Sequence, residues 1–330
     1  MARENVASIK YLDIKAYGSP WAALHLKFMK LMTRVLLPLI RVRGLGVIAE
    51  TIKKATHNSG LYTEIRLNKD TLFTYPTYDS YWASYVLMDR PYERSIELLL
   101  KEISSVEYVF IDCGSNFGYW SAIVTSQDFG SHKCVAIEAS AETYQGLKRT
   151  AIKNDERFVC LNYAISDGSS DSISFSEGGR HAGRHIIDGS IEKMEVNKKL
   201  FFTPKEYQVD VKTIALDQIK KLYFLEEKNF LIKLDVEGAE IAAIMGAPEL
   251  LQEDCAFIYE DFGGDEESHV TKFFLREGFE VFYPDMEGVV WKIQDINVIK
   301  KLKTDRHAGY NLLAIKGEGE LAVKVRVISS

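Results

Sequence analysis

From residue 106 onward, short runs rich in β-branched and aromatic residues alternate with stretches of helical periodicity. The first run, 106–112, is followed by a glycine-containing turn and a helix expected at 119–126. Further strands are expected at 134–138, 158–164, 209–214, 230–235 and 255–260. Regular alternation of this kind predicts an α/β fold with a mostly parallel sheet. The closing runs predict antiparallel strands at one edge, because only one helix comes before them: 280–283, 289–293 and 311–315.

Charge and cysteine content narrow the class of protein. Residues 1–60 carry ten Lys and Arg against three Asp and Glu, whereas the whole chain has a net charge of −6. The body is therefore acidic, which argues against a nucleic-acid partner. Four cysteines with no C-x-x-C pair exclude a disulfide scaffold and a zinc ribbon. We expect buried free thiols in a reducing compartment, and hence a cytoplasmic protein.

The amino-terminal region differs in kind from the rest. We expect residues 1–85 to form a basic, largely helical extension, and residues 86–330 to form the α/β domain with a loop insertion at 177–207. Residues 21–43 have the pattern of a basic amphipathic helix, too often interrupted by Lys and Arg to cross a membrane. Two interpretations stay open: the helix packs on the domain, or it makes a peripheral contact with the inner face of the membrane.

The turn after the first strand is the strongest local signal for a ligand. Asp112 ends the strand, and Gly114, Asn116 and Gly118 follow before the helix. No Gly-Lys-Ser/Thr is present, which disfavours a nucleoside triphosphate, and the absence of Gly-x-Gly-x-x-Gly weakens a nicotinamide interpretation. An acidic residue at the strand end suits a ligand that has an ammonium group.

A second acidic residue follows at the end of the next strand. Glu138 is placed to accept both hydroxyls of a ribose, as in doubly wound nucleoside sites. The alternative is a surface carboxylate that caps the helix beginning near Ala141. Together with the glycine turn, Glu138 predicts a nucleoside with a zwitterionic tail, and S-adenosyl-L-methionine fits that description.

The segment Lys-x-Asp-x-Glu-Gly-x-Glu at 233–240 makes a resemblance specific. With Ile-Asp-x-Gly-x-Asn-x-Gly at 111–118, Asn-Tyr-Ala-Ile-Ser-Asp at 162–167 and Val-Lys-Thr-Ile-Ala-Leu-Asp at 211–217, the sequence resembles the FkbM family of S-adenosylmethionine-dependent methyltransferases. The resemblance covers about residues 90–262. It implies a class I Rossmann-like methyltransferase fold, with a mostly parallel seven-stranded sheet and an antiparallel terminal strand, and O-methylation of a sugar, glycan or glycoconjugate hydroxyl.

The resemblance also implies where the cofactor binds. The contacts expected from it are Asp112, Gly114, Asn116 and Gly118 at the methionine end, Glu138 at the ribose, Ala164 and Asp167 near the adenine, and Glu93 before the first helix of the domain.

Several groups are candidates for removing the proton of the acceptor hydroxyl. Asp235 and Glu237 follow the 230–235 strand, and they are expected either as the base or as hydrogen-bond acceptors for the sugar. His181 and His185, in the 177–207 loop, are candidates on a lid. Glu237 also suits helix capping, and the histidines also suit a solvated loop.

A magnesium ion is the other way to activate the hydroxyl. Asp235 and the pair Glu260 and Asp261 end neighbouring strands, and three carboxylates with water and vicinal hydroxyls suit Mg²⁺. Catechol methyltransferases place a lysine base three residues after the aspartate, but the corresponding residue here is Gly238.

Two alternatives to the methyltransferase stay open at this point. One is an NAD(P)-dependent oxidoreductase, and the other is a non-catalytic nucleoside-binding scaffold associated with the membrane. If the 21–43 helix touches a membrane, a lipid-linked glycan becomes the natural acceptor. A homo-oligomer also stays open.

Overall fold

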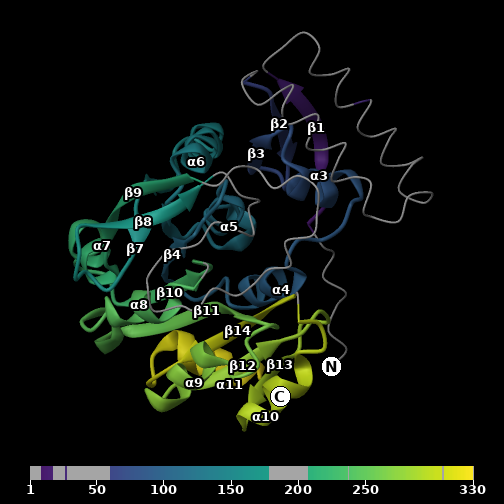
Figure 1. The fold of residues 1–330 in the computed structure, drawn as a ribbon. Coiled ribbons are helices and arrows are strands. Elements are labelled where there is room, and N and C mark those ends of the chain that lie inside the picture. The colour runs from purple at the N-terminus through teal and green to yellow at the C-terminus, as the bar shows by residue number, and fades with distance from the viewer. Residues whose placement is uncertain are drawn as a thin grey trace.

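An eight-stranded sheet forms the centre of the protein in a computed structural model, which describes residues 9–17, 27, 60–177, 207–236, 238–306 and 308–329 (Figure 1). In spatial order its strands are β13 (Val290–Ile293), β12 (Glu280–Pro284), β14 (Gly309–Ile315), β11 (Asp254–Phe262), β10 (Asn229–Leu234), β4 (Val109–Cys113), β5 (Lys133–Ile137) and β6 (Val159–Leu161).

Strand direction confirms the expected mostly parallel sheet. Neighbours from β11 through β10, β4 and β5 to β6 are parallel, whereas β14 is antiparallel to both β11 and β12. β13, which the sequence predicted as a strand at 289–293, pairs antiparallel with β12 at the edge of the sheet. The sheet therefore has one strand more than the seven that the family resemblance implied. β5 and β6 follow β4 on one side of it, whereas β10 and β11 lie on its other side. The direction in which strands are added therefore reverses at β4, and such a topological switch point is where α/β proteins bind ligands.

Helices cover both faces of this sheet, and the alternation of strand side chains separates the two cores. In β4, Phe110 belongs to one core, whereas Val109 and Ile111 belong to the other. The first face is covered by α4 (Arg94–Glu102), α5 (Tyr119–Val124), α6 (Ala141–Lys153) and α11 (Glu320–Ile328). The second face is covered by α7 (Leu216–Tyr223), α8 (Glu240–Met245), α9 (His269–Arg276) and α10 (Ile296–Leu302).

The described part of the amino-terminal region consists mainly of strands, where the sequence predicted a largely helical extension. An antiparallel sheet is formed by β1 (Leu12–Tyr17), β2 (Tyr62–Arg66) and β3 (Leu72–Pro76), and helix α3 (Ser80–Leu87) follows it. β3 packs on α6, since Thr74 bonds Thr150 at 3.0 Å and Asn154 Nδ2 donates to the carbonyl of Leu72 at 2.6 Å. The helix expected at 21–43 lies outside the described residues, residue 27 apart.

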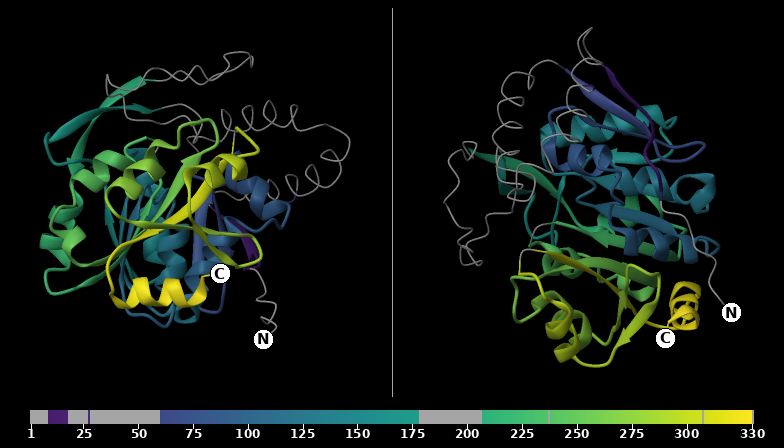
Figure 2. Two further views of the ribbon diagram at one scale, coloured as in Figure 1. Left: turned by 90° about the horizontal axis from the view of Figure 1, so that it is seen from below. Right: turned by 90° about the vertical axis from the view of Figure 1, so that its right-hand side faces the viewer.

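A small separate sheet contains β7 (Ala164–Ile165), β8 (Ser172–Glu177) and β9 (Tyr207–Ile214). β7 pairs with β9, and β9 pairs antiparallel with β8. In the left view of Figure 2 the hairpin of β8 and β9 stands at one margin of the molecule. The loop insertion joins β8 to β9 and lies outside the described residues.

Two carboxyl-terminal helices were not expected from the sequence. α11 contains many β-branched residues, but its buried side chains recur at helical spacing and its Leu321 N–H donates to Asp254 Oδ2 at 2.9 Å. α10 is a short helix of seven residues.

The four cysteines are free, as predicted, with Cys160 half-buried and the others buried. Within the described ranges, no helix is both long and apolar enough to span a membrane.

A buried histidine makes a prediction about acid stability. The ring of His132 stacks on Tyr108 with centroids 3.7 Å apart, and burial lowers its pKa from 6.5 to about 4. Between these two values the unfolded chain binds a proton that the folded chain excludes, so stability falls as pH falls from 6.5 to 4.

His132→Phe keeps the stacked ring and removes this titration. The slope of the unfolding free energy against pH reports how many more protons the unfolded chain binds than the folded one. We expect His132→Phe to lower this number by up to about one between pH 4 and 6.5. Urea denaturation at several pH values measures it. Parallel curves for the two proteins would show that His132 does not titrate as described.

Candidate active site

A row of polar side chains crosses the carboxyl ends of the central strands. Strand register and side-chain alternation place the row on the first face of the sheet, the one covered by α4 and α5. In the strand register, Lys233 of β10 lies opposite Asp112 of β4, and Glu260 of β11 lies opposite Asn311 of β14. We call this set the polar row; its members are Glu138, Asp112, Lys233, Asp235, Glu260 and Asn311.

The turn between β4 and α5 bends back over β5. Gly114 and Gly118 have φ of 77° and 83°, and Asn116 also lies in the left-handed region at 54°. The backbone N–H groups of Gly114 and Ser115 both donate to the carbonyl of Ile137, each at 2.9 Å. The sequence is glycine-rich at these points because the left-handed region is costly for residues with a Cβ.

The N–H groups of this turn are all used within the protein. The Asn116 N–H donates to Glu138, the Phe117 N–H to the Asn116 side chain, and the Gly118 N–H to the Ser115 carbonyl. A phosphate-binding loop needs such N–H groups to point at the ligand. The turn is therefore poorly suited to a diphosphate.

The ends of β4 and β10 approach each other more closely than any side chain would allow. The Asp235 N–H donates to the carbonyl of Cys113 at 3.0 Å. A Cβ added to Gly114 would lie 1.9 Å from the Asp235 carbonyl oxygen. Asp235 is thus fixed directly beside the glycine turn, and a ligand resting on that turn also meets Asp235.

Glu138 has both carboxylate oxygens oriented by backbone donors. Oε2 accepts from Asn116 N–H at 3.0 Å, and Oε1 accepts from Ser140 N–H at 2.9 Å. These two bonds hold the half-buried side chain at the end of β5. Ser140 itself caps α6, so the capping role considered for Glu138 belongs to Ser140.

Lys233 is the buried cation of the site. Its side chain is 4% exposed, and its ammonium group donates to Asp235 Oδ2 at 2.8 Å. Burial lowers the pKa of Lys233, but the carboxylates of Asp235, Glu93 and Asp112 outweigh it and hold that pKa above its usual value. The ion pair is with Asp235, and Asp112 lies opposite Lys233 on the neighbouring strand.

Asp112 is buried beneath the turn, where Ser121 Oγ of α5 donates to its Oδ2 at 2.6 Å. Burial raises the pKa of Asp112 from 3.8 to about 6, and Lys233 and Ser121 oppose that rise. Asp112 lies in a position where water screens its charge weakly.

Glu93 joins the polar row from the start of α4. Trp120 Nε1 donates to Glu93 Oε2 at 2.6 Å, and Asn311 Nδ2 donates to Oε1 at 3.2 Å. The backbone of Glu93 has φ of 41°, a conformation that costs free energy and places the side chain away from the helix end, which it does not cap. Glu93 thereby links α4 to both α5 and β14.

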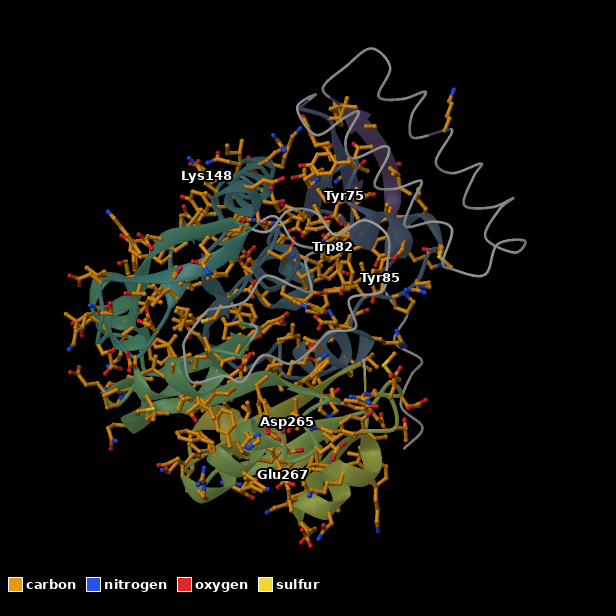
Figure 3. The ribbon with its side chains drawn as sticks, in the orientation of Figure 1. Tyr75, Trp82, Tyr85, Lys148, Asp265 and Glu267 are labelled. Atoms are coloured by element: carbon orange, nitrogen blue, oxygen red, sulfur yellow. The ribbon has the colours of Figure 1, made fainter. Side chains whose placement is uncertain are left out.

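Aromatic residues from the amino-terminal region support the turn. Trp82 of α3 is buried, and its Nε1 donates to Asn116 Oδ1 at 3.3 Å. Trp82 packs against Tyr92 and Tyr119, with ring centroids 4.5 Å and 5.2 Å away. In Figure 3, Trp82 lies near Tyr85, whose ring centroid is 6.4 Å from its own. Tyr92 also lies near Asp235, whose charge contributes, after burial and Glu93, to raising the tyrosine pKa. Sequence reasoning missed Trp82.

A cavity of about 540 Å³ opens beside the β5 end of the row. It is bounded by the residues after β5 and β6, by α6 and by β9, and its lining includes Ala139, Tyr144, Asn162, Tyr163 and Lys212. Ala164 and Asp167 do not line it. Ala164 is buried in β7, and Asp167 is exposed and accepts from the Ser169 N–H, so their adenine role stays a prediction.

Asp235, Glu260 and Asp261 do not form the magnesium site that the sequence predicted. Glu260 and Asp261 are consecutive in β11, so their side chains point to opposite faces. Glu260 lies over the α-carbon of Gly309, whereas Asp261 is buried in an ion pair with Lys303 on the second face. In the parts of the chain that the structure describes, no three His, Cys, Asp or Glu side chains are grouped to hold a metal ion.

Three candidate catalytic residues lie outside the described residues: Glu237, His181 and His185. Their roles stay predictions.

Comparisons with known proteins identify a family for this chain. The profile of the methyltransferase FkbM domain family matches residues 112–281, which is more than half of the chain. Hexuronic acid methyltransferase AglP from Haloferax volcanii is 25% identical over 201 residues, covering 61% of this chain and 74% of that protein.

Solved structures show weaker likeness. Methyltransferase FkbM from Methylobacillus flagellatus has a TM-score of 0.37 and 12% identity; the match covers 73% of this chain and 53% of that one, so this chain spans about half of its length. An S-adenosylmethionine-dependent O-methyltransferase from Thermotoga maritima has a TM-score of 0.35 and 12% identity, covering 69% of this chain and 66% of that one.

The contact between Gly114 and Asp235 predicts a specific loss of stability. Gly114→Ala combines the cost of a left-handed alanine, about 1–2 kcal/mol, with the clash against the Asp235 carbonyl. Gly317→Ala is a matched control, because Gly317 has φ of 84° with no atom within 4 Å of its added Cβ. We expect Gly114→Ala to be ~1–3 kcal/mol less stable than Gly317→Ala in chemical denaturation. Equal stability of the two variants would contradict the close approach.

Proposed function

The chain belongs to the methyltransferase FkbM domain family, and on that premise we propose that it transfers a methyl group from S-adenosyl-L-methionine to a hydroxyl of a sugar, glycan or glycoconjugate. The glycine turn supports this ligand best, because its N–H groups are satisfied internally while carboxylates surround it. Such a site suits an ammonium-bearing nucleoside. It suits a dinucleotide phosphate poorly, which argues against the oxidoreductase alternative.

Different residues of the polar row would bind different parts of the proposed ligand. The turn from Gly114 to Gly118, with Asp112 beneath it, would hold the amino-acid end, and Glu138 would accept the ribose hydroxyls. The cavity is lined by Ala139, which follows Glu138 in the chain, and by Asn162, and it has room for a nucleobase. When bound, S-adenosylmethionine supplies an activated methyl group for in-line displacement.

Asp235 is the proposed base or orienting group for the acceptor. Its side chain is 30% exposed, and the ion pair with Lys233 holds it beside the glycine turn. Glu260 lies one strand further along the same face and is half-buried. A positioned base typically accelerates such a reaction by about 10²–10⁴-fold, and alignment of the reacting groups adds to this.

The sugar class of the acceptor draws support from the relative that is described as a hexuronic acid methyltransferase. A cytoplasmic location is proposed from the four free cysteines, which suit a reducing compartment. A lipid-linked acceptor, contact of residues 21–43 with the inner face of the membrane, and assembly into a homo-oligomer are further proposals that rest on the sequence.

Binding of S-adenosylhomocysteine tests the cofactor assignment without an acceptor. We expect calorimetric titration to show micromolar binding and no binding of NAD⁺. Glu138→Gln removes one charged acceptor, and it should weaken S-adenosylhomocysteine by about 10-fold or more. Glu142→Gln on exposed α6 surface is the control and should leave the affinity unchanged. Binding of NAD⁺ alone would replace the methyltransferase proposal with the oxidoreductase.

Methyl transfer itself is tested with methyl-labelled S-adenosylmethionine and a panel of neutral, amino and uronic acid sugars. We expect label on an oxygen of at least one acceptor, with turnover reduced about 10²–10⁴-fold in Asp235→Asn because the base is lost. Asp128→Asn, at the opposite end of the sheet, should retain full turnover. Turnover of Asp235→Asn equal to the wild type would remove Asp235 from the catalytic role.

A further inference from the structure

Helix α3 carries an inference about the acceptor, and this inference rests on the proposed function. Exposed side chains of the helix and of the segment after it form a surface that we call the α3 strip; its members are Tyr81, Tyr85, Met88 and Arg90. We propose that the α3 strip binds the acceptor and selects a sugar that bears a carboxylate. The strip precedes residue 112, where the family match begins, so the family profile does not include it.

The two faces of α3 differ in burial. Trp82 and Val86 are one turn apart, and both are buried in the core of the first sheet face. Tyr81, Tyr85 and Met88 also recur at helical spacing, yet Tyr81 is 41% exposed and Met88 is 39% exposed. Large apolar side chains that lie singly on a surface need no explanation, whereas a contiguous group of them is typical of a binding surface.

Arg90 adds a positive charge to the strip. Its guanidinium carbon lies 4.9 Å from the ring centroid of Tyr85, and that centroid is 5.2 Å from the ring centroid of Tyr81. The arginine side chain is exposed, and no carboxylate of the described residues forms an ion pair with it. Guanidinium groups bind carboxylates through two parallel hydrogen bonds, and they also stack on aromatic rings. The strip therefore offers an anion-binding group beside aromatic rings.

Helix α3 is anchored to the glycine turn. Trp82 Nε1 donates to Asn116 Oδ1 at 3.3 Å, and the ring centroid of Trp82 is 6.0 Å from that of Tyr81. Because Asn116 follows the end of β4, this contact places α3 at the carboxyl ends of the central strands. A ligand on the strip is therefore at the same edge of the sheet as the proposed cofactor.

Tyr92 connects the strip to the Asp235 side of the site. Its ring centroid is 6.2 Å from that of Tyr81, and the next residue, Glu93, accepts from Asn311 of β14. In the strand order, β14, β11 and β10 all lie on one side of β4, and Asp235 follows β10. The proposed ribose contact follows β5 on the other side of β4. The strip thus adjoins the side of the site that holds the proposed base.

The chemistry of the strip fits an acidic sugar. The electron-rich face of Tyr81 suits the C–H groups on the face of a pyranose ring, because these hydrogens are weakly positive. Arg90 suits a carboxylate on the same sugar. The two contacts together would fix the plane and the direction of the ring, which is what presentation of one hydroxyl to Asp235 requires. A neutral sugar would keep the stacking contact and lose the charged one.

Two small glycosides test the role of Arg90 in the complex with S-adenosylhomocysteine. Methyl β-D-glucuronide has a carboxylate where methyl β-D-glucoside has a hydroxymethyl group. We expect calorimetry to show the glucuronide bound about tenfold or more tightly than the glucoside, because its hydrogen bonds to Arg90 are charge-assisted. Arg90→Gln should reduce this ratio to within about threefold. Arg276→Gln, which changes an exposed arginine at the end of α9, should leave the ratio unchanged.

The role of Tyr81 is tested with the same ligands. Tyr81→Ala should weaken both glycosides by about fivefold or more, because the stacking face is lost. Tyr223→Ala removes a tyrosine of α7 that is 43% exposed, and it should leave both affinities unchanged. If Tyr81→Ala does not fold, as judged by circular dichroism, Tyr81→Leu is the second variant, since leucine keeps an apolar side chain and lacks the aromatic face.

The outcomes separate this inference from the proposed function. Equal affinity of the wild type for the two glycosides, or binding of S-adenosylhomocysteine with neither glycoside bound, would overturn the inference and leave the cofactor assignment standing. An unchanged ratio in Arg90→Gln, or unchanged affinities in the Tyr81 variant, would overturn it equally. Failure of S-adenosylhomocysteine itself to bind would overturn the proposed function as well.

Discussion

The buried ammonium group of Lys233 is the interaction on which the site depends. It lies near the carboxyl end of an otherwise apolar strand, and it is stable there because carboxylates from β4, the start of α4 and the end of β10 lie around it. Without that cation, Asp112 and Asp235 would be two like charges at the ends of adjacent strands. Lys233 thus allows three carboxylates to be gathered beside a turn whose own N–H groups are already bonded. The chemistry of the site follows from that surplus of acceptors.

Parts of the chain outside the family match complete this arrangement. The match begins at residue 112, but Glu93 and Trp82 precede it and Asn311 follows it. Trp82 fixes the side chain of Asn116, and Glu93 joins α4 to α5 and β14 through two hydrogen bonds. Residues from both the amino-terminal and the carboxyl-terminal segments therefore help to fix the side chains around the turn.

Sequence patterns predicted the central sheet and the glycine turn because both depend on local signals: alternating apolar runs, and glycines at positive φ. They did not predict α11, because its β-branched residues favour a strand. The cap on its first turn comes from Asp254, which is remote in the sequence. The expected metal site failed for a reason of register, since Glu260 and Asp261 point to opposite faces. The contact of Glu93 with Asn311 joins residues 218 positions apart, and nothing local indicates it.

A crystal structure of the complex with S-adenosylhomocysteine tests the central claim most directly. The account predicts that the amino-acid end lies on the turn from Gly114 to Gly118 and that the ribose hydroxyls bond Glu138. A ligand whose ribose is remote from Glu138, or whose amino-acid end is remote from the turn, would contradict it.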